Sequence, residues 1–164
     1  LNCPFFNTAR MVKDYARRAY FPVSDRFHTM TSDNCAPAKE LSHWKKQLLA
    51  KWYDIKIEAV DISQNQEVKV NQSIDVKARI NLMGLTPADV QVELYQGSVD
   101  VNGDIIGGVP VVMEYLGEDP HNASLYTADI TYTSSGLQGL SLRVLPKHDN
   151  LSSPYEAGVI LWAH

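Results

Sequence analysis

The stretch Ile74-Asp-Val-Lys-Ala-Arg-Ile-Asn-Leu82 decides the fold, because its apolar and polar residues alternate without interruption. A period of two is typical of a β-strand with one buried face and one solvated face. The same alternation recurs at residues 55–58, 90–94, 126–132 and 140–144. Residues 109–116 and 159–162 are continuous apolar runs instead, which predicts strands covered on both sides.

Turn-forming residues separate these segments, as at Gly84–Pro87, Asn102-Gly103 and Pro146–Asn150. About seven or eight short strands, each with an apolar face, are typical of an antiparallel β-sandwich of immunoglobulin-like type. The Cys…Trp…Cys pattern of antibody domains is absent.

Upstream of the strands the apolar period changes to that of a helix. One apolar stripe, at spacings of one, three and four residues, predicts a helix from about residue 8 to 20. Pro22 is expected to end it, because proline disfavours helical geometry in the preceding residue, and residues 22–34 are predicted to be a polar connector. The stripe consists of Met11, Val12, Tyr15, Ala16, Ala19 and Tyr20.

A second helix is predicted to begin at Ala36-Pro37, with Asn34 or Cys35 before it, since proline is tolerated in a first helical turn. Its apolar face contains Leu41, Trp44, Leu48, Leu49 and Trp52. The predicted fold class is therefore mainly β with an α-helical N-terminal segment: an antiparallel immunoglobulin-like β-sandwich preceded by two helices.

Charge changes at the same place as the apolar period. Residues 1–52 carry a net charge of +5 and residues 53–164 a net charge of −9, which together give the −4 of the chain. The contrast predicts two units: a helical segment, residues 1–52, and a C-terminal β-sandwich domain, residues 53–164. The chain starts with Leu1 rather than Met and has no signal-peptide pattern, so we expect a processed protein or a fragment.

Composition excludes several classes of protein. No run of apolar residues is long enough to span a membrane. Two cysteines, Cys3 and Cys35, make neither a disulfide framework nor a zinc site, and we expect them to be reduced in a cytoplasmic protein. Glycosylation sequons at Asn71, Asn122 and Asn150 carry weight only in a secreted protein.

Catalytic and ligand-binding motifs are missing: there is no GxGxxG, GxxxxGK[ST], HExxH or GxSxG. The segment Asp100–Asp104 lacks the further ligands of a calcium loop and is interpreted as an Asn-Gly hairpin turn. The histidines are scattered singly and are interpreted as surface or capping residues: His28, His43, His121, His148 and His164. The carboxylates are interpreted as solvated strand faces rather than a glycosidase pair: Glu93, Asp100, Asp104, Glu114, Glu118 and Asp119.

Six aromatic residues of the β-part are a candidate sugar-stacking platform, since aromatic rings offer flat apolar faces. The alternative is that they belong to the core or the sheet rim. They are Tyr95, Tyr115, Tyr126, Tyr132, Tyr155 and Trp162. The basic first helix could contact phosphates, but the chain is acidic overall and has no nucleic-acid reader motif, so no nucleic acid is expected.

Several stretches resemble the C-terminal end of bacterial α-glucan (glycogen, starch or maltodextrin) phosphorylases. Near the start these are Phe6–Val12 followed by Asp14-Tyr15, and Leu41-Ser-His-Trp-Lys45. Near the end they are Arg143–His148, Leu151 and Pro154–Ala163. In one branch of that family, closing helices are followed by an appended β-rich tail.

The resemblance implies a parent glycosyltransferase that moves a glucosyl unit from an α-1,4-glucan to phosphate. It implies pyridoxal phosphate on a lysine of the parent, within a stretch like G-T-G-N-M-K that this chain lacks. No catalytic, cofactor-binding or metal-binding residue is therefore assigned to any position here. Residues 1–52 would be the last helices of the catalytic body, and residues 53–164 the appendage.

The sequence is compatible with three functions. The chain is a non-catalytic structural or assembly appendage, a carbohydrate-binding module that tethers the enzyme to α-glucan, or a free-standing protein-interaction domain. The expected partners are the remainder of the parent chain, α-glucan or a second copy of the chain. The apolar stripe of the first helix should dock on one of these or on the sandwich. Trp44→Ala tests the docking: a loss of about 3 kcal/mol or more would show a packed indole, and no change would show a loose helix.

Overall fold

The computed structural model describes residues 8–63, 70–133 and 135–163. The chain divides into two compact units, Leu1–Trp44 and Lys45–His164. The described part of the first unit is helical, and the second contains the last turns of the final helix and eight strands. We call the second unit the two-sheet domain. The prediction of a mainly β chain with a helical N-terminal segment is confirmed.

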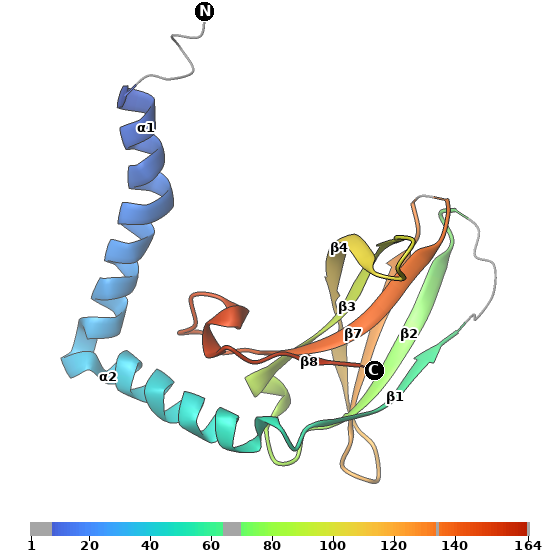
Figure 1. Cartoon of the computed structure of the whole chain (residues 1–164). Helices are drawn as coiled ribbons and strands as arrows, with labels where there is room; N and C mark the ends of the chain where they lie inside the picture. The colour runs from blue at the N-terminus through green and yellow to red at the C-terminus, as the bar shows by residue number, and fades with distance from the viewer. Residues whose placement is uncertain (1–7, 64–69, 134, 164) are drawn as a thin grey trace, which may run out of the picture. The chain divides into compact units, whose positions relative to one another are not determined.

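The eight strands form two four-stranded antiparallel sheets (Figure 1). Sheet A has the order β1-β2-β6-β5, and sheet B has the order β4-β3-β7-β8. Their bounds are β1 Lys56–Ile62, β2 Ser73–Asn81, β3 Val90–Val99, β4 Ile105–Val112, β5 Glu114–Glu118, β6 Ser124–Thr131, β7 Gln138–Pro146 and β8 Leu161–Trp162. The expected number of strands is therefore correct.

The core is built from the alternating residues that predicted the strands. The apolar residues of β2 from Ile74 to Ile80, and Leu82 just after the strand, are all buried, and Val76 and Ile80 have no exposed surface. Opposite them on β6, Ala128 pairs with Val76 and Ile130 pairs with Ile74. Burying a side chain of this size stabilises a fold by about 1.5 to 3 kcal/mol, so β2 and β6 form the centre of sheet A.

The apolar run at residues 109–116 was expected to be covered on both sides, and this was wrong. The run is divided between β4 and β5, which are edge strands of different sheets. Only Met113, where the chain crosses between the sheets, is buried at 5% exposure, whereas Val109, Val112 and Leu116 are exposed. The run at 159–162 is likewise an edge, since β8 pairs only with β7 and Ile160 is exposed.

The helical segment differs from the prediction at Pro22. Helix α1 (Thr8–Tyr15) continues through one π-helical turn (Ala16–Tyr20) into α2 (Phe21–Trp52). Pro22 therefore does not end the helix, and most of the predicted connector is helical. A π-helical turn widens the backbone just before the proline, which offsets the missing N–H and the clash of its ring with the preceding turn.

Helix α2 is interrupted once, at Ser32–Cys35. Asp33, Asn34 and Cys35 have φ values between 47° and 62°, in the left-handed region. Asp and Asn tolerate this conformation better than most residues. The interruption lies directly before Ala36-Pro37, where the sequence predicted the second helix to begin.

The last turns of α2 contribute to the core of the two-sheet domain. Leu48 is completely buried and Trp52 is 2% exposed, whereas Leu49, which was predicted on the same face, is 40% exposed. The buried positions are four residues apart, which places them on one side of a helix. Lys51 Nζ donates to the carbonyl of Gly84 at 2.7 Å, so the helix end is also held by the loop after β2.

No helix in the described residues is both long enough and apolar enough to cross a membrane. Cys35 is a free thiol of intermediate burial, and Cys3 lies outside the described residues.

Candidate functional site

An ion pair is sealed into one face of sheet B. Glu93 on β3 lies directly opposite Arg143 on β7 in the strand register. Arg143 Nε donates to Glu93 Oε2 at 2.7 Å, and Nη2 lies 2.7 Å from the same oxygen. Their side chains are only 6% and 8% exposed. The interpretation of Glu93 as a solvated carboxylate was therefore wrong, because its partner comes from a strand fifty residues away.

Two further hydrogen bonds reach this pair. Gln91 Nε2 donates to Glu93 Oε1 at 2.5 Å, and Arg143 Nη2 donates to the Tyr155 hydroxyl at 3.3 Å. Buried charges stabilise a fold only where such additional hydrogen bonds are present. Both ends of the ion pair therefore have neutral polar neighbours.

Three aromatic rings surround the guanidinium of Arg143. Its Cζ lies 4.9 Å from the ring centroid of Tyr95, 5.4 Å from that of Trp162 and 5.9 Å from that of Tyr155. Trp162 on β8 is also the register partner of Arg143 and packs edge-on against Tyr95 at 5.7 Å. Cation–π contacts are strongest when the cation is shielded from water. We call Gln91, Glu93, Tyr95, Arg143, Tyr155 and Trp162 the Arg143 cluster.

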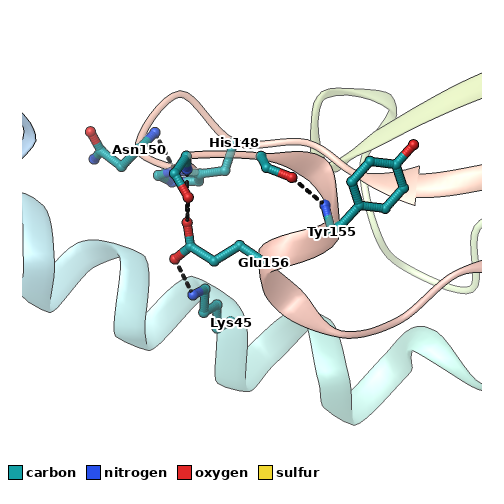
Figure 2. Close-up of polar contacts among 7 residues, drawn as sticks. Lys45, His148, Asn150, Tyr155 and Glu156 are labelled. Atoms are coloured by element: carbon teal, nitrogen blue, oxygen red, sulfur yellow. Dashed lines mark hydrogen bonds and ion pairs between the residues drawn. The ribbon is translucent and has the colours of Figure 1, made fainter. Parts of the chain in front are cut away.

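A second set of polar contacts joins the segment after β7 to α2 (Figure 2). Lys45 Nζ lies 2.6 Å from Glu156 Oε1, and Glu156 Oε2 accepts from the backbone N–H and the hydroxyl of Ser152 at 2.7 and 2.6 Å. Glu156 lies in a 3₁₀ turn, Pro154–Ala157, in which the Ser153 hydroxyl accepts from the backbone N–H of Tyr155. We call Lys45, Ser152 and Glu156 the Lys45 clasp.

The clasp changes the acidity of Glu156. Partial burial acts to raise the pKa of this carboxyl, but hydrogen bonds from Lys45 and Ser152 outweigh it and lower the pKa from 4.5 to about 2. The charged carboxylate is therefore the form that the fold favours.

Because its pKa is lower in the folded state, Glu156 stabilises the domain above about pH 4.5, and this contribution is lost as the pH falls toward about 2. The side chain keeps 23% of its surface exposed, so solvent screening should limit the effect to about 1 kcal/mol. We expect Glu156→Gln to lower the free energy of unfolding by this amount near neutral pH, and by less at about pH 3. Urea denaturation at both pH values measures it. An equal loss at the two pH values would contradict the assignment.

Two further candidate carboxylates, Asp100 and Asp119, accept hydrogen bonds from the backbone of their own turns. Asp100 Oδ1 accepts from the backbone N–H groups of Asn102 and Asp104 at 2.8 and 2.9 Å, and these bonds, led by that of Asp104, lower its pKa. The predicted hairpin turn between β3 and β4 is thereby confirmed. Asp119 similarly accepts from the backbone of His121 and Ala123. Both side chains shape turns.

Two of the histidines have local contacts within their own segments. His28 lies against Phe27, with ring centroids 6.0 Å apart, and His148 Nδ1 accepts from the Asn150 backbone N–H at 3.1 Å (Figure 2). His164 lies outside the described residues. Across residues 8–63, 70–133 and 135–163, no group of three or more His, Cys, Asp or Glu side chains could hold a metal ion.

The six candidate platform aromatics lie in three different places. Tyr95, Tyr155 and Trp162 belong to the Arg143 cluster. Tyr115 and Tyr126 form a pair on sheet A at 5.6 Å, and Tyr126 is 3% exposed. Tyr132 lies apart from both groups. Of the six rings, Tyr155 is 53% exposed and Tyr115 is 42% exposed. The other four are partly or fully buried and present little surface to a ligand.

The Arg143 cluster and the Lys45 clasp each hold segments that are distant in sequence together. The charged groups of the Arg143 cluster are closed off from water and satisfied by neighbours. Sequence reasoning missed the cluster, although one signal was present: Gln91, Glu93 and Tyr95 alternate with the buried Val92 and Leu94 and so share the opposite face of β3.

A model of the glycogen phosphorylase C-terminal domain family matches residues 52–164, which is more than half of the chain. The match contains all eight strands, the whole Arg143 cluster, and Ser152 and Glu156 of the Lys45 clasp.

Curated relatives extend the similarity upstream of that match. A glycogen phosphorylase of Mycobacterium tuberculosis (strain H37Rv) is 27% identical over 156 residues, covering 94% of this chain and 18% of the relative. A glycogen phosphorylase of Mycobacterium bovis gives the same values. A maltodextrin phosphorylase of Thermococcus litoralis is 29% identical over 168 residues, covering 97% of this chain and 18% of the relative. The chain thus spans less than a fifth of the length of these relatives.

Proposed function

The chain belongs to the glycogen phosphorylase C-terminal domain family, and from this premise we propose that it is the C-terminal part of an α-glucan phosphorylase, in which the two-sheet domain braces the end of the catalytic body. On this proposal the domain is a structural appendage and carries out no chemistry. The domain boundary predicted between residues 52 and 53 stays a prediction. The compact unit that includes Lys45–Trp52 favours counting the last turns of α2 with the appendage.

One observation supports the bracing role: an ion pair joins the last residue of an upstream phosphorylase-like stretch to a downstream one. Lys45 ends the upstream stretch and pairs with Glu156 of the downstream stretch at 2.6 Å. Within the downstream stretch, Arg143 contacts Tyr155 and Trp162. A close ion pair between residues 111 positions apart is typical of a structural joint.

We also propose that the two sheets pack face to face as an immunoglobulin-like sandwich. The support is that both have one buried face, lined by Val76 and Ile80 in sheet A and by Val92, Leu94 and Val144 in sheet B.

The parent activity follows from the family and from no residue of this chain. We propose that the parent is a cytoplasmic enzyme that transfers a glucosyl unit from α-1,4-glucan to phosphate and releases glucose 1-phosphate. Pyridoxal phosphate would be held upstream, because no stretch here resembles its lysine-bearing segment. Three of the described lysines have structural partners: Lys45 contacts Glu156, Lys51 donates to the carbonyl of Gly84, and Lys77 pairs with Asp75.

The remainder of the parent chain is the proposed partner of the helical unit. Four apolar side chains of the predicted stripe are exposed: Met11 at 54%, Val12 at 58%, Tyr15 at 58% and Tyr20 at 70%. An exposed apolar stripe of this kind marks an interaction surface. The family relatives are more than five times the length of this chain and supply a body that could cover it. Self-association through the stripe is the alternative.

The experiment compares this chain with the longest reading frame that contains it. We expect the longer protein to form glucose 1-phosphate from soluble starch and phosphate, and the chain alone to form none. Phosphorolysis by the chain alone would contradict the non-catalytic role. A frame that does not continue upstream into a lysine-bearing cofactor segment would instead favour the free-standing interaction domain.

A carbohydrate-binding module remains the second candidate function. An exposed aromatic platform does not support it, since the six rings are dispersed and three lie in the Arg143 cluster. Affinity electrophoresis in glycogen or soluble starch tests this function. Because the aromatic rings are dispersed, we expect neither polysaccharide to retard the chain.

A further inference from the structure

A small open pocket lies at one end of the two-sheet domain, away from the Arg143 cluster. Its volume is about 190 Å³, and it is bordered by β3, β4, β6 and the first residue of β7. The pocket therefore receives side chains from both sheets. Its polar lining residues are Gln96, Ser98, Thr131, Tyr132, Thr133 and Gln138.

The chemistry of the lining excludes a charged ligand. Among the described residues that border the pocket there is no Asp, Glu, Lys, Arg or His. Burial raises the pKa of the Tyr132 phenol, so this group stays neutral. Hydroxyl and amide groups dominate the wall, and Ile106 and Val109 add apolar surface. A phosphate or a metal ion would find no compensating charge there.

Gln96, which lines the pocket, carries a buried side-chain oxygen, Oε1, that has no hydrogen-bond partner among the described residues. A buried acceptor without a donor costs about 1 to 3 kcal/mol, and native proteins retain few of them. The terminal torsion of glutamine is broad, so a small rotation can turn this oxygen toward a donor that enters the pocket.

We propose that this pocket binds one uncharged, hydroxyl-bearing ring, such as a single sugar unit, with a ligand hydroxyl donating to Gln96 Oε1. Hydroxyl groups supply the missing donor and match the Ser, Thr and Gln side chains of the wall. The C–H faces of the ring match Ile106 and Val109. Typical pockets for drug-sized ligands have about 300 to 1,000 Å³, so this one has room for a single ring and not for an oligosaccharide.

This binding site goes beyond the bracing role and does not depend on it. The proposed ligand has two sources, a free monosaccharide and one unit of a glucan chain. Both present the same ring, so the experiment must compare sugars with different numbers of units.

The test is a titration of the isotope-labelled full chain, followed by NMR, with glucose, maltotriose and inorganic phosphate in parallel. We expect glucose and maltotriose to shift the Gln96 side-chain amide and the Ser98 and Gln138 backbone amides in a saturable way, with Kd on the order of millimolar. Phosphate should shift none of them. Similar affinity for both sugars identifies a free ring, and affinity for maltotriose at least about tenfold higher identifies a chain.

Two variants make the result specific. Gln96→Leu should weaken glucose binding by about tenfold or more while leaving the melting temperature equal or higher, because it removes an acceptor that lacks a donor. Ser98→Trp fills the pocket from an exposed strand position and should abolish binding even if Gln96→Leu fails to fold. A matched control, Tyr155→Phe in the Arg143 cluster, should bind glucose as the parent chain does.

The proposal is overturned if no pocket amide shifts with either sugar up to about 100 mM, or if the shifts survive both pocket variants. Shifts confined to Tyr115 and Tyr155 would also overturn it, since they would place the sugar on exposed rings. None of these results bears on bracing, which is measured by the stability of the clasp and helix variants.

Discussion

Leu48→Ala should lower the free energy of unfolding of the two-sheet domain by about 2 to 5 kcal/mol. Leu48 has no exposed surface although it lies on a helix upstream of every strand. Removing its side chain leaves a cavity that the surrounding groups close only in part, so the loss exceeds the transfer energy of the deleted atoms. Urea denaturation, monitored by tryptophan fluorescence, measures the change.

Leu49→Ala is the matched control, because it makes the same deletion one residue along the same helix. Leu49 is 40% exposed, and substitutions at such positions usually change stability by about 0.5 kcal/mol or less. Equal effects of the two substitutions would contradict the assignment of the helix end to the core. The pair also separates packing from helix propensity, which both substitutions alter alike.

Arg143→Met should cost about 3 to 5 kcal/mol, because it leaves the Glu93 carboxylate buried without its cation. The side chain of Glu93 is 6% exposed and retains only the hydrogen bond from Gln91 as compensation. The double substitution Glu93→Leu with Arg143→Met should recover most of the loss, since replacing both charges with apolar groups is often neutral or stabilising. Urea denaturation of the three variants measures the coupling between the two positions.

Arg79→Met provides the comparison for an exposed ion pair. Arg79 Nε lies 3.1 Å from Glu58 Oε2, with side chains 45% and 32% exposed. Exposed pairs contribute about 0 to 1 kcal/mol, so this variant should remain close to the parent chain. An Arg143 variant no less stable than the Arg79 variant would show that the Glu93–Arg143 pair is open to water in solution.

The alternation of apolar and polar residues predicted where the strands lie in the sequence. It did not predict which strands lie at the edge of a sheet and which at its centre. The alternation from Ile74 to Leu82 identified β2 and its buried face residue by residue. The same reasoning failed at Val109–Leu116, because an apolar run does not reveal whether a neighbouring strand covers it. Edge position is decided by strand order, which depends on contacts distant in sequence.

The helical segment shows the same limit at two residues. A proline usually ends a regular α-helix, but here the helix continues through Pro22 because the π-helical turn before it accommodates the ring. The apolar periodicity of the sequence does not predict that turn. Leu49 fits the apolar stripe as well as Leu48 does by spacing. Only the packing surface distinguishes a buried leucine from its exposed neighbour.

The candidate sites depended even more on distant partners. Nothing in the local sequence distinguishes Glu93 from the other carboxylates, because its partner Arg143 lies opposite it on a strand that is distant in sequence. The Lys45 clasp and the unpartnered Gln96 oxygen are equally invisible in a single sequence. The negative result on catalytic motifs needed no structure, because those motifs are local.

We infer that the last turns of α2 are built into the two-sheet domain and let this domain brace what precedes them. Native-state amide hydrogen exchange of the chain measures whether they are. We expect the backbone amides from Leu48 to Trp52 to exchange only on global unfolding, with the same free energy of opening as those of β3 and β7. Exchange at Leu48–Trp52 as fast as in α1, while β3 and β7 stay protected, would contradict it.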